Sequence, residues 1–323
     1  MDIPMQVALL ISSFLVTLVG GSLILPLLKK LNLGQNVRED GPESHLTKAG
    51  TPSMGGIIFL IPFVIFVLVL GYRYEGLRMI MYPLLTITLA YAGIGFLDDY
   101  IKVKKKRSTG LLAWQKMLLL LVVSGGYVYY LLEVFGVGTH IYLPFFKTYI
   151  DLGIWYIPFA ILVLISTTNV VNITDGLDGL AGGIMVIMLT FFAVYGIINQ
   201  INGITYISAI LIGACLGFLV YNINPARVFM GDTGSLALGG FLGAIALMLQ
   251  LPLILLVVAG VCVIEALSDI IQVVYFKITN GKRIFKMAPL HHHLELSGWS
   301  EKRVTRVFYA ITIILCVIGI FLV

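Results

Sequence analysis

Long apolar runs alternate with short polar segments along almost the whole chain. A membrane-spanning helix needs about 20 mainly apolar residues, and ten runs approach or exceed that length. We predict spans at 5–28, 54–70, 79–97, 111–132, 155–171, 180–198, 204–221, 236–249, 251–276 and 304–323. The runs 155–171 and 236–249 are short, so we expect them inside a helix bundle. The run 251–276 is too long for a straight crossing, so we expect it to be tilted, or bent and protruding on the inner side.

The composition agrees with this pattern. Hydrophobic residues make up 59% of the 323 residues and charged residues only 11%, with a mean hydropathy of +1.01. Soluble proteins carry about 25% charged residues, so much of this apolar surface must face lipid. Cys215, Cys262 and Cys316 lie within apolar runs and are expected to be small buried hydrophobic residues. We predict an all-α membrane protein that forms a single domain over residues 1–323.

The basic residues fall mainly on one set of loops. Of the 21 Lys and Arg residues, 18 lie in or beside loops 29–53, 98–110, 222–235 and 277–303. Positive charge marks the cytoplasmic side, so these loops are predicted to be cytoplasmic and both termini external. Asp2 before the first run and Lys29-Lys30 after it agree with an external N-terminus. The net charge of +5 therefore gives no indication of nucleic-acid binding.

One external segment differs from the helical pattern. Residues 139–152 contain β-branched and aromatic side chains without helical periodicity. This composition indicates a short external β-hairpin.

An acidic pair, Asp98-Asp99, closes the third predicted span. The pair could simply be solvated past the end of a helix. However, two adjacent carboxylates at a helix C-terminus are unfavourable for the helix dipole. Lys102, one turn later, supplies part of the compensation, and a bound Mg²⁺ could supply more.

Other acidic residues occur in Gly-rich segments at predicted helix starts. Asp175 and Asp178 precede the span at 180, and Asp232 precedes the span at 236. Asp178 and Asp232 could each be a helix cap. Alternatively, a carboxylate beside free backbone N–H groups would suit a Mg²⁺-bound diphosphate.

Two further polar patterns lie near the C-terminal end. His291, His292 and His293 are consecutive and so point in different directions, which favours hydrogen bonding to phosphate or carboxylate over one shared metal. Polar residues also recur on one face of the run 251–276, where lipid contact would be costly. The four residues are Glu265, Ser268, Asp269 and Gln272. The face that they share should line the bundle interior, a cavity or a subunit contact. For Ser268 and Gln272, hydrogen bonding between helices is the simplest explanation.

Several sequence motifs together resemble those of one enzyme family. The motifs at 48–56, 98–102, 169–180 and 229–235 resemble those of the polyprenyl-phosphate N-acetylhexosamine-1-phosphate transferases. The stretch 287–299, with its three histidines, Glu295 and Trp299, resembles one branch, the bacterial phospho-N-acetylmuramoyl-pentapeptide-transferases. The resemblance extends over nearly the whole chain, from loop 29–53 to the last span.

This resemblance implies a Mg²⁺-dependent reaction at the cytoplasmic face of the bacterial plasma membrane. Undecaprenyl phosphate would attack UDP-N-acetylmuramoyl-pentapeptide, releasing UMP and forming lipid I. It also implies a homodimer. Asp98 would be the base, or else a covalent nucleophile, Asp99 would support it, and Asp232 would bind Mg²⁺. The nucleoside would lie among Asp175, Gly176, Leu177, Asp178 and Phe229. The residues that bind the phosphates or hydrogen-bond to those that do would be Lys48, Lys102, Lys116, Asn172, Asn222, His291, His292 and His293.

Two other functions remain open at this point. An ion-coupled transporter would also have many spans, but would place its acids near the bilayer midplane, where only Glu265 is a candidate. A sister transferase would share the acids but use UDP-N-acetylglucosamine.

Overall fold

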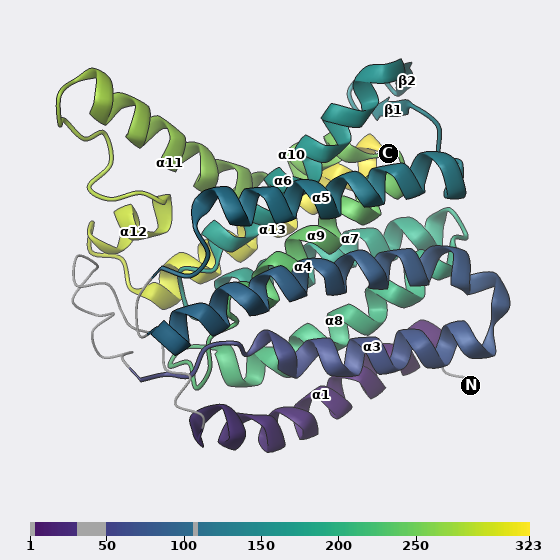
Figure 1. Cartoon of the computed structure of the whole chain (residues 1–323), viewed down its shortest axis with the longest axis horizontal. Helices are drawn as coiled ribbons and strands as arrows, with labels where there is room; N and C mark the ends of the chain where they lie inside the picture. Colours follow the sequence, from purple (N-terminus) through teal and green to yellow (C-terminus); the bar gives the residue numbers. More distant parts are fainter. Residues whose placement is uncertain (1–3, 31–49, 106–108) are drawn as a thin grey trace.

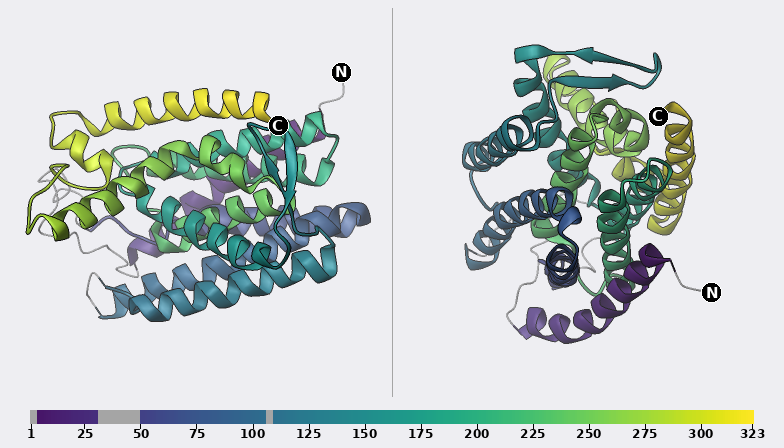
Figure 2. Two further views of the ribbon diagram at one scale, coloured as in Figure 1. Left: turned by 90° about the horizontal axis from the view of Figure 1, so that it is seen from above. Right: turned by 90° about the vertical axis from the view of Figure 1, so that its right-hand side faces the viewer.

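The protein forms a bundle of long helices, seen in a computed structural model that describes residues 4–30, 50–105 and 109–323. Figure 1 shows most of these helices running along the long axis of the molecule, and Figure 2 shows the bundle from above and from one end. The long helices are α1 Met5–Lys30, α3 Gly56–Arg73, α4 Arg78–Lys105, α5 Ala113–Tyr130, α6 Tyr156–Thr174, α7 Leu180–Ile198, α8 Asn202–Asn222, α9 Gly231–Met248 and α13 Glu301–Leu322.

The predicted number of spans is confirmed. Within the described residues nine helices are long and apolar enough to cross a membrane, or ten when a bent pair is counted as one span. Short helical turns extend several of them, at Glu75–Leu77, Leu131–Phe135 and Gly153–Trp155.

The predicted span 251–276 is bent, which is one of the two outcomes expected from its length. A turn at Pro252–Ile254 leads into α10 (Leu255–Val258), and α11 (Gly260–Ile278) follows at an angle of 85°. Figure 1 shows α11 leaving the bundle at the left, next to the short helix α12 (Leu290–Glu295), which the sequence did not predict.

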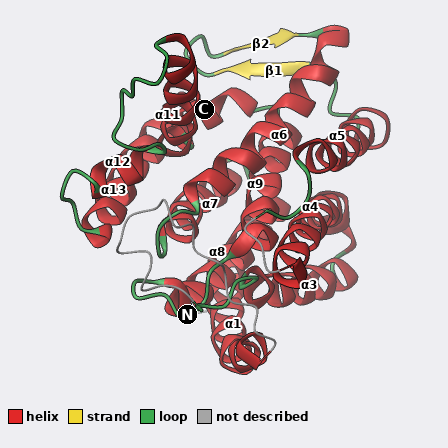
Figure 3. Cartoon of the chain, turned by 60° about the vertical axis from the view of Figure 1, so that its left-hand side comes forward, coloured by secondary structure: helices red, strands yellow, loops and turns green. Residues whose placement is uncertain are grey.

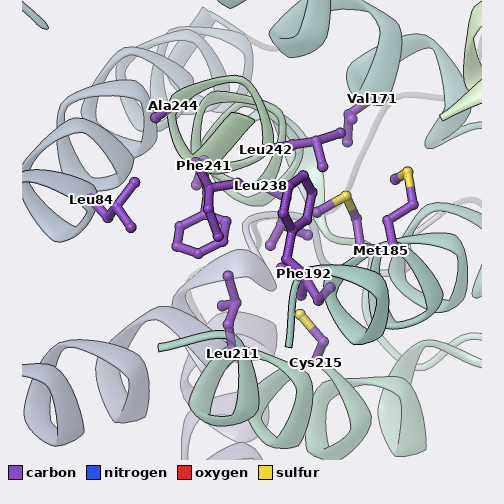
Figure 4. Packing of buried hydrophobic residues seen from close by; sticks show 14 of the residues in the cluster. Leu84, Val171, Met185, Phe192, Leu211, Cys215, Leu238, Phe241, Leu242 and Ala244 are labelled. Atoms are coloured by element: carbon purple, nitrogen blue, oxygen red, sulfur yellow. The ribbon is translucent and has the colours of Figure 1, made fainter. Parts of the chain in front are cut away.

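Helix α9 is the centre of the bundle. It is only 18 residues long, and 89% of them are buried inside the protein. It packs mainly against α4 and α6, and Figure 4 shows Leu238, Phe241 and Leu242 of α9 meeting Phe192 of α7. This helix tolerates its short length because protein, rather than lipid, surrounds it.

The hairpin predicted from the composition of residues 139–152 is present. Strands β1 (His140–Leu143) and β2 (Thr148–Asp151) pair antiparallel, with His140 opposite Asp151 and Leu143 opposite Thr148. They form the only sheet of the described chain (Figure 3). The hairpin, the Met5 end of α1 and the C-terminus lie at one end of the bundle, whereas α12 and the Lys105 end of α4 lie at the other (Figure 1).

One predicted boundary is wrong in a way that matters for the site. The third span was expected to end at 97, but α4 continues to Lys105, so Asp98 and Asp99 lie inside the helix and both are buried. They are therefore not a solvated pair beyond a helix end. The helix can continue because each carboxylate finds hydrogen-bond partners within the protein.

Candidate active site

Three carboxylates meet where α4 crosses the start of α9. Oxygen atoms of Asp98, Asp99 and Asp232 lie within 4.8 Å of one another. The two helices come this close because residue 95 is glycine: a Cβ atom there would overlap the Asp232 carbonyl oxygen. Residues distant in sequence thus form one acidic centre.

Asp99 satisfies the buried start of α9. Its Oδ1 accepts a bond from the Asp232 N–H at 3.2 Å, and its Oδ2 accepts bonds from the Thr233 N–H at 2.9 Å and hydroxyl at 2.7 Å. The first N–H groups of a helix have no partner within the helix, and a carboxylate there is favoured by the helix dipole. The sequence-based expectation of free N–H groups at this helix start is therefore wrong for Asp232 and Thr233.

Asp98 is held by a lysine and by a backbone group. The Lys102 ammonium lies 2.6 Å from its Oδ2, and the Leu111 N–H donates to its Oδ1 at 2.8 Å. The expected compensation by Lys102 is confirmed, and it comes with a loop contact that the sequence did not indicate.

Asp232 is the most connected of the three acids. Its Oδ2 lies 2.7 Å from the Lys116 Nζ and 3.2 Å from the Lys102 Nζ, and its Oδ1 accepts a bond from the Asn172 Nδ2 at 3.0 Å. Two ammonium groups thus face three carboxylates, which leaves an excess of one negative charge when all are ionised. Three converging carboxylates are hard oxygen donors of the kind that Mg²⁺ prefers, so the residues fit a magnesium site.

The loop between α6 and α7 lies beside this centre. Burial raises the pKa of Asp175 well above its usual range, and the negative charges of Asp232, Asp99 and Asp178 raise that pKa further. An aspartic acid that stays protonated can donate a hydrogen bond. The electrostatic effect also shows that Asp175 is close enough to interact with the acidic centre.

Asp178 does not cap α7, contrary to one of the two sequence interpretations. The capping residue is Gly179, which has a positive φ of 76°. The Asp178 Oδ2 instead accepts bonds from the Asn224 Nδ2 at 3.1 Å and the Ala226 N–H at 2.9 Å, and its own N–H donates to the Glu301 Oε1 at 2.6 Å. Asp178 therefore connects the α6–α7 loop to the α8–α9 loop and to the start of α13.

Asn222 and Phe229 lie beside the α6–α7 loop. The Asn222 Oδ1 accepts a bond from the Gly179 N–H at 3.1 Å, and its Nδ2 donates to the Val228 carbonyl at 2.9 Å. Phe229 is half-buried two residues before α9, and its backbone pairs with Pro52 and Gly55. Both residues lie between the loop and the start of α9.

The three histidines do have different partners. The His291 Nδ1 lies 2.6 Å from the Glu265 Oε2, the His292 Nδ1 lies 3.1 Å from the Glu295 Oε2, and the His293 Nδ1 accepts the Lys286 N–H at 3.1 Å. Only His291 is fully buried, and a Cβ atom at Gly176 would overlap its Nε2. His291 therefore lies against the α6–α7 loop.

Comparison with known proteins decides which family this site belongs to. The profile of glycosyl transferase family 4 matches residues 80–250, and a phospho-N-acetylmuramoyl-pentapeptide-transferase signature matches residues 48–60. Proteins named phospho-N-acetylmuramoyl-pentapeptide-transferase are similar over nearly their whole length. Those of Clostridium kluyveri and Acetivibrio thermocellus are 48% and 50% identical over 307 and 327 residues, covering 95% and 99% of this chain and 96% of each relative. The protein from the Alaska E43 strain of Clostridium botulinum is 49% identical, over 98% of this chain and 96% of its own length. The chain belongs to the phospho-N-acetylmuramoyl-pentapeptide-transferase family.

The residues predicted for this transferase site mostly come together. The acidic centre contains Asp98, Asp99, Asp232, Lys102, Lys116 and Asn172, and the adjoining wall contains Asp175, Gly176, Leu177, Asp178, Asn222, Phe229 and His291. His292 and His293 lie on the same short helix as His291 but face other partners. Lys48 lies outside the described residues.

Sequence reasoning missed three residues that hold the acids of this candidate site in place. Asn224 and Glu301 hold Asp178, and Leu111 holds Asp98. No local pattern marks them, because each acts through a contact between distant segments. Glu265, the one candidate for a midplane acid, binds His291 at the same end as the site, which removes the feature that favoured a transporter.

Proposed function

We propose that this protein transfers phospho-N-acetylmuramoyl-pentapeptide from its UDP-linked donor to undecaprenyl phosphate, giving lipid I and UMP. The observation that carries the proposal is the acidic centre with two lysines at one end of a membrane bundle, in a chain related over its full length to enzymes of that name. A lipid phosphate and a soluble nucleotide can meet only at a membrane face, which is where this centre lies.

The chemistry requires charge neutralisation more than covalent catalysis. An oxygen of the lipid phosphate attacks the β-phosphorus of the donor, a new P–O bond forms, and the bond to UMP breaks. Phosphoryl transfer is stabilised mainly by positioning and by cations near the phosphate oxygens. Lys102, which lies among the three carboxylates, and Lys116, which pairs with Asp232, are suited to that task.

We assign the base to Asp98, with the alternative that it is a covalent nucleophile. As a base it would take the remaining proton from the lipid phosphate. Asp99 supports it indirectly, because its carboxylate fixes the start of α9 and so places Asp232. Asp232, which faces both lysines, would hold Mg²⁺, and the metal would neutralise charge on the diphosphate.

The nucleoside is proposed to bind against the wall formed by the α6–α7 loop and Phe229. Phe229 would stack on the uracil, and Asp175, Gly176, Leu177 and Asp178 would surround the ribose and base. In its protonated form Asp175 would donate to a carbonyl or hydroxyl oxygen. Phosphate contacts are assigned to Lys48, Asn172, Asn222, His291, His292 and His293.

We further propose that the protein lies in the bacterial plasma membrane with this site facing the cytoplasm, as a homodimer. The distribution of basic residues supports the orientation, and the family resemblance supports the dimer.

Cysteine labelling tests the orientation. The three native cysteines are buried, so an introduced cysteine should dominate labelling. A membrane-impermeant reagent added to intact cells should label Thr148→Cys in the hairpin but not Lys282→Cys beyond α11, both of which replace exposed residues. Labelling of Lys282→Cys, but not of Thr148→Cys, would reverse the orientation.

Donor choice tests the reaction itself. The purified protein would be given undecaprenyl phosphate, Mg²⁺ and either UDP-N-acetylmuramoyl-pentapeptide or UDP-N-acetylglucosamine. We expect UMP release with the first donor and little or none with the second. The segment 282–293 carries Lys282, Arg283, Lys286 and the histidines beside the site, where they would suit the carboxylates of a peptide. Preference for the N-acetylglucosamine donor would assign the protein to the sister reaction and leave the acidic centre's role intact.

A further inference from the structure

A polar face of α11 fastens the segment before α12. Gln272 donates from its Nε2 to the Phe285 carbonyl at 2.9 Å, and its Oε1 accepts the Ile284 and Phe285 N–H groups at 3.1 Å each. Glu265 lies two turns earlier on the same face and reaches α12. The interhelical bonding expected for Gln272 is thus a bond to a loop. Within the described part of the chain, the Ser268 hydroxyl bonds to the Glu265 carbonyl of its own helix and to no other helix.

Glu265 makes two hydrogen bonds to one residue. Its Oε1 accepts the His291 backbone N–H at 3.1 Å, and its Oε2 lies 2.6 Å from the His291 Nδ1. Both residues are 0% exposed. Among the described residues no lysine or arginine forms an ion pair with Glu265. Two bonds to the backbone and ring of the same residue fix both the position and the rotation of the imidazole.

The other ring nitrogen, His291 Nε2, is buried without a hydrogen-bond partner among the described residues. It faces Gly176, in the loop whose Asp175 interacts electrostatically with the acidic centre. Buried polar atoms nearly always have partners, so an unpaired nitrogen beside a substrate loop points to a group that the substrate supplies.

Charge balance determines which kind of group that is. A buried carboxylate without a cation is costly, and among the described residues His291 is the one basic side chain paired with Glu265. The pair avoids a net charge either as carboxylate and imidazolium or as carboxylic acid and neutral imidazole. In both forms the Nε2 atom carries a hydrogen: in the first because both ring nitrogens are protonated, and in the second because Nδ1 accepts the bond from the carboxylic acid O–H. His291 Nε2 is therefore a donor, and its complement is an oxygen acceptor such as a phosphate oxygen.

We propose that Glu265 is a positioning residue for the transfer reaction: it holds His291 so that the Nε2–H donates to a phosphate oxygen of the nucleotide-linked donor. The inference rests on the proposed function. A purely structural clamp would need only the backbone bond to His291 N–H, and Gln272 already provides such a clamp two turns away.

The test is a double-mutant cycle on UMP release. Asparagine at 291 carries nothing at the Nε2 position, so His291→Asn should lower kcat about 10²-fold, as for loss of one donor to developing charge. Glu265→Leu should cause a loss of about the same size. Glu265→Gln should lose about tenfold, because its amide can still hold the ring but cannot stabilise an imidazolium. The double variant Glu265→Leu/His291→Asn should be no slower than His291→Asn alone, since both changes remove one interaction. KM for undecaprenyl phosphate should not change.

Ser268→Ala is the matched control, because it removes a buried polar group from the same face without touching His291. We expect its kcat to stay within about twofold of the unmodified protein. Additive losses in the double variant, or Glu265→Leu and Glu265→Gln being equally active, would overturn the inference. If the Leu variant does not elute as a folded protein, Glu265→Asp serves instead: its shorter side chain should hold only one of the two bonds, and unchanged kcat would contradict the assignment. Absence of UMP release by the unmodified protein would refute the proposed function and is a separate outcome.

Discussion

Replacing Asp232 by asparagine is expected to lower the rate of UMP release about 10²–10³-fold while the protein remains folded. The side chain keeps nearly the same shape, and its Oδ1 can still accept the bond from Asn172. What is lost is the negative charge that faces Lys102 and Lys116 at 3.2 and 2.7 Å. Without that charge the two lysines lose their shared partner, and the Mg²⁺ proposed to bind there would lose a charged ligand. Initial rates would be measured over a range of Mg²⁺ concentrations, and the dependence on Mg²⁺ should weaken or shift to higher concentrations.

The matched control for this experiment is Asp151→Asn. Asp151 is an exposed acid on the hairpin at the opposite end of the bundle, and its carboxylate accepts bonds from Thr139 and from the Gly153 N–H. Its replacement should leave the rate and the Mg²⁺ dependence unchanged. An Asp232→Asn protein with a normal rate at low Mg²⁺ would show that the metal assignment is wrong.

The second large effect is expected at Asp98. Asp98→Asn should abolish the chemical step, with at least about a 10²-fold loss, and should leave binding of the nucleotide donor largely intact. The asparagine Oδ1 can still accept the Leu111 N–H, so the loop after α4 should keep its place. Only the bond from the Lys102 ammonium at 2.6 Å and the capacity to take a proton are lost. Rates of UMP release and equilibrium binding of UDP-N-acetylmuramoyl-pentapeptide would be compared on the same preparation.

A single turnover experiment separates the two roles considered for Asp98. If Asp98 is a base, the protein mixed with the donor alone should release no UMP, because the attacking lipid phosphate is absent. If Asp98 is a nucleophile, UMP should appear in an amount equal to the enzyme, together with a covalent adduct. Normal turnover by Asp98→Asn at neutral pH would exclude both roles.

Much of this protein follows from its sequence, because the physical rules concerned are local. A span is recognised by about 20 apolar residues, whatever it packs against, and the length of the run 251–276 showed that it must be either tilted or bent. The hairpin at 139–152 follows from side-chain type. The sharing of one end of the bundle by Asp98, Asp175, Asp232 and the histidines follows from counting spans.

The individual contacts depended on the tertiary structure. Local pattern ended the third span before Asp98, whereas α4 continues to Lys105 because Lys102 and the start of α9 satisfy the two carboxylates. Asp178 precedes a helix as a capping residue does, yet it binds Asn224 across the bundle. A carboxylate takes whichever donors the fold brings within about 3 Å, and those donors come from segments far away in the sequence. The sequence by itself therefore determined the spans, the hairpin and the residue types of the site. Only the tertiary structure decided that Asp99 caps α9 and that Glu265 holds His291, because both depend on how distant helices cross.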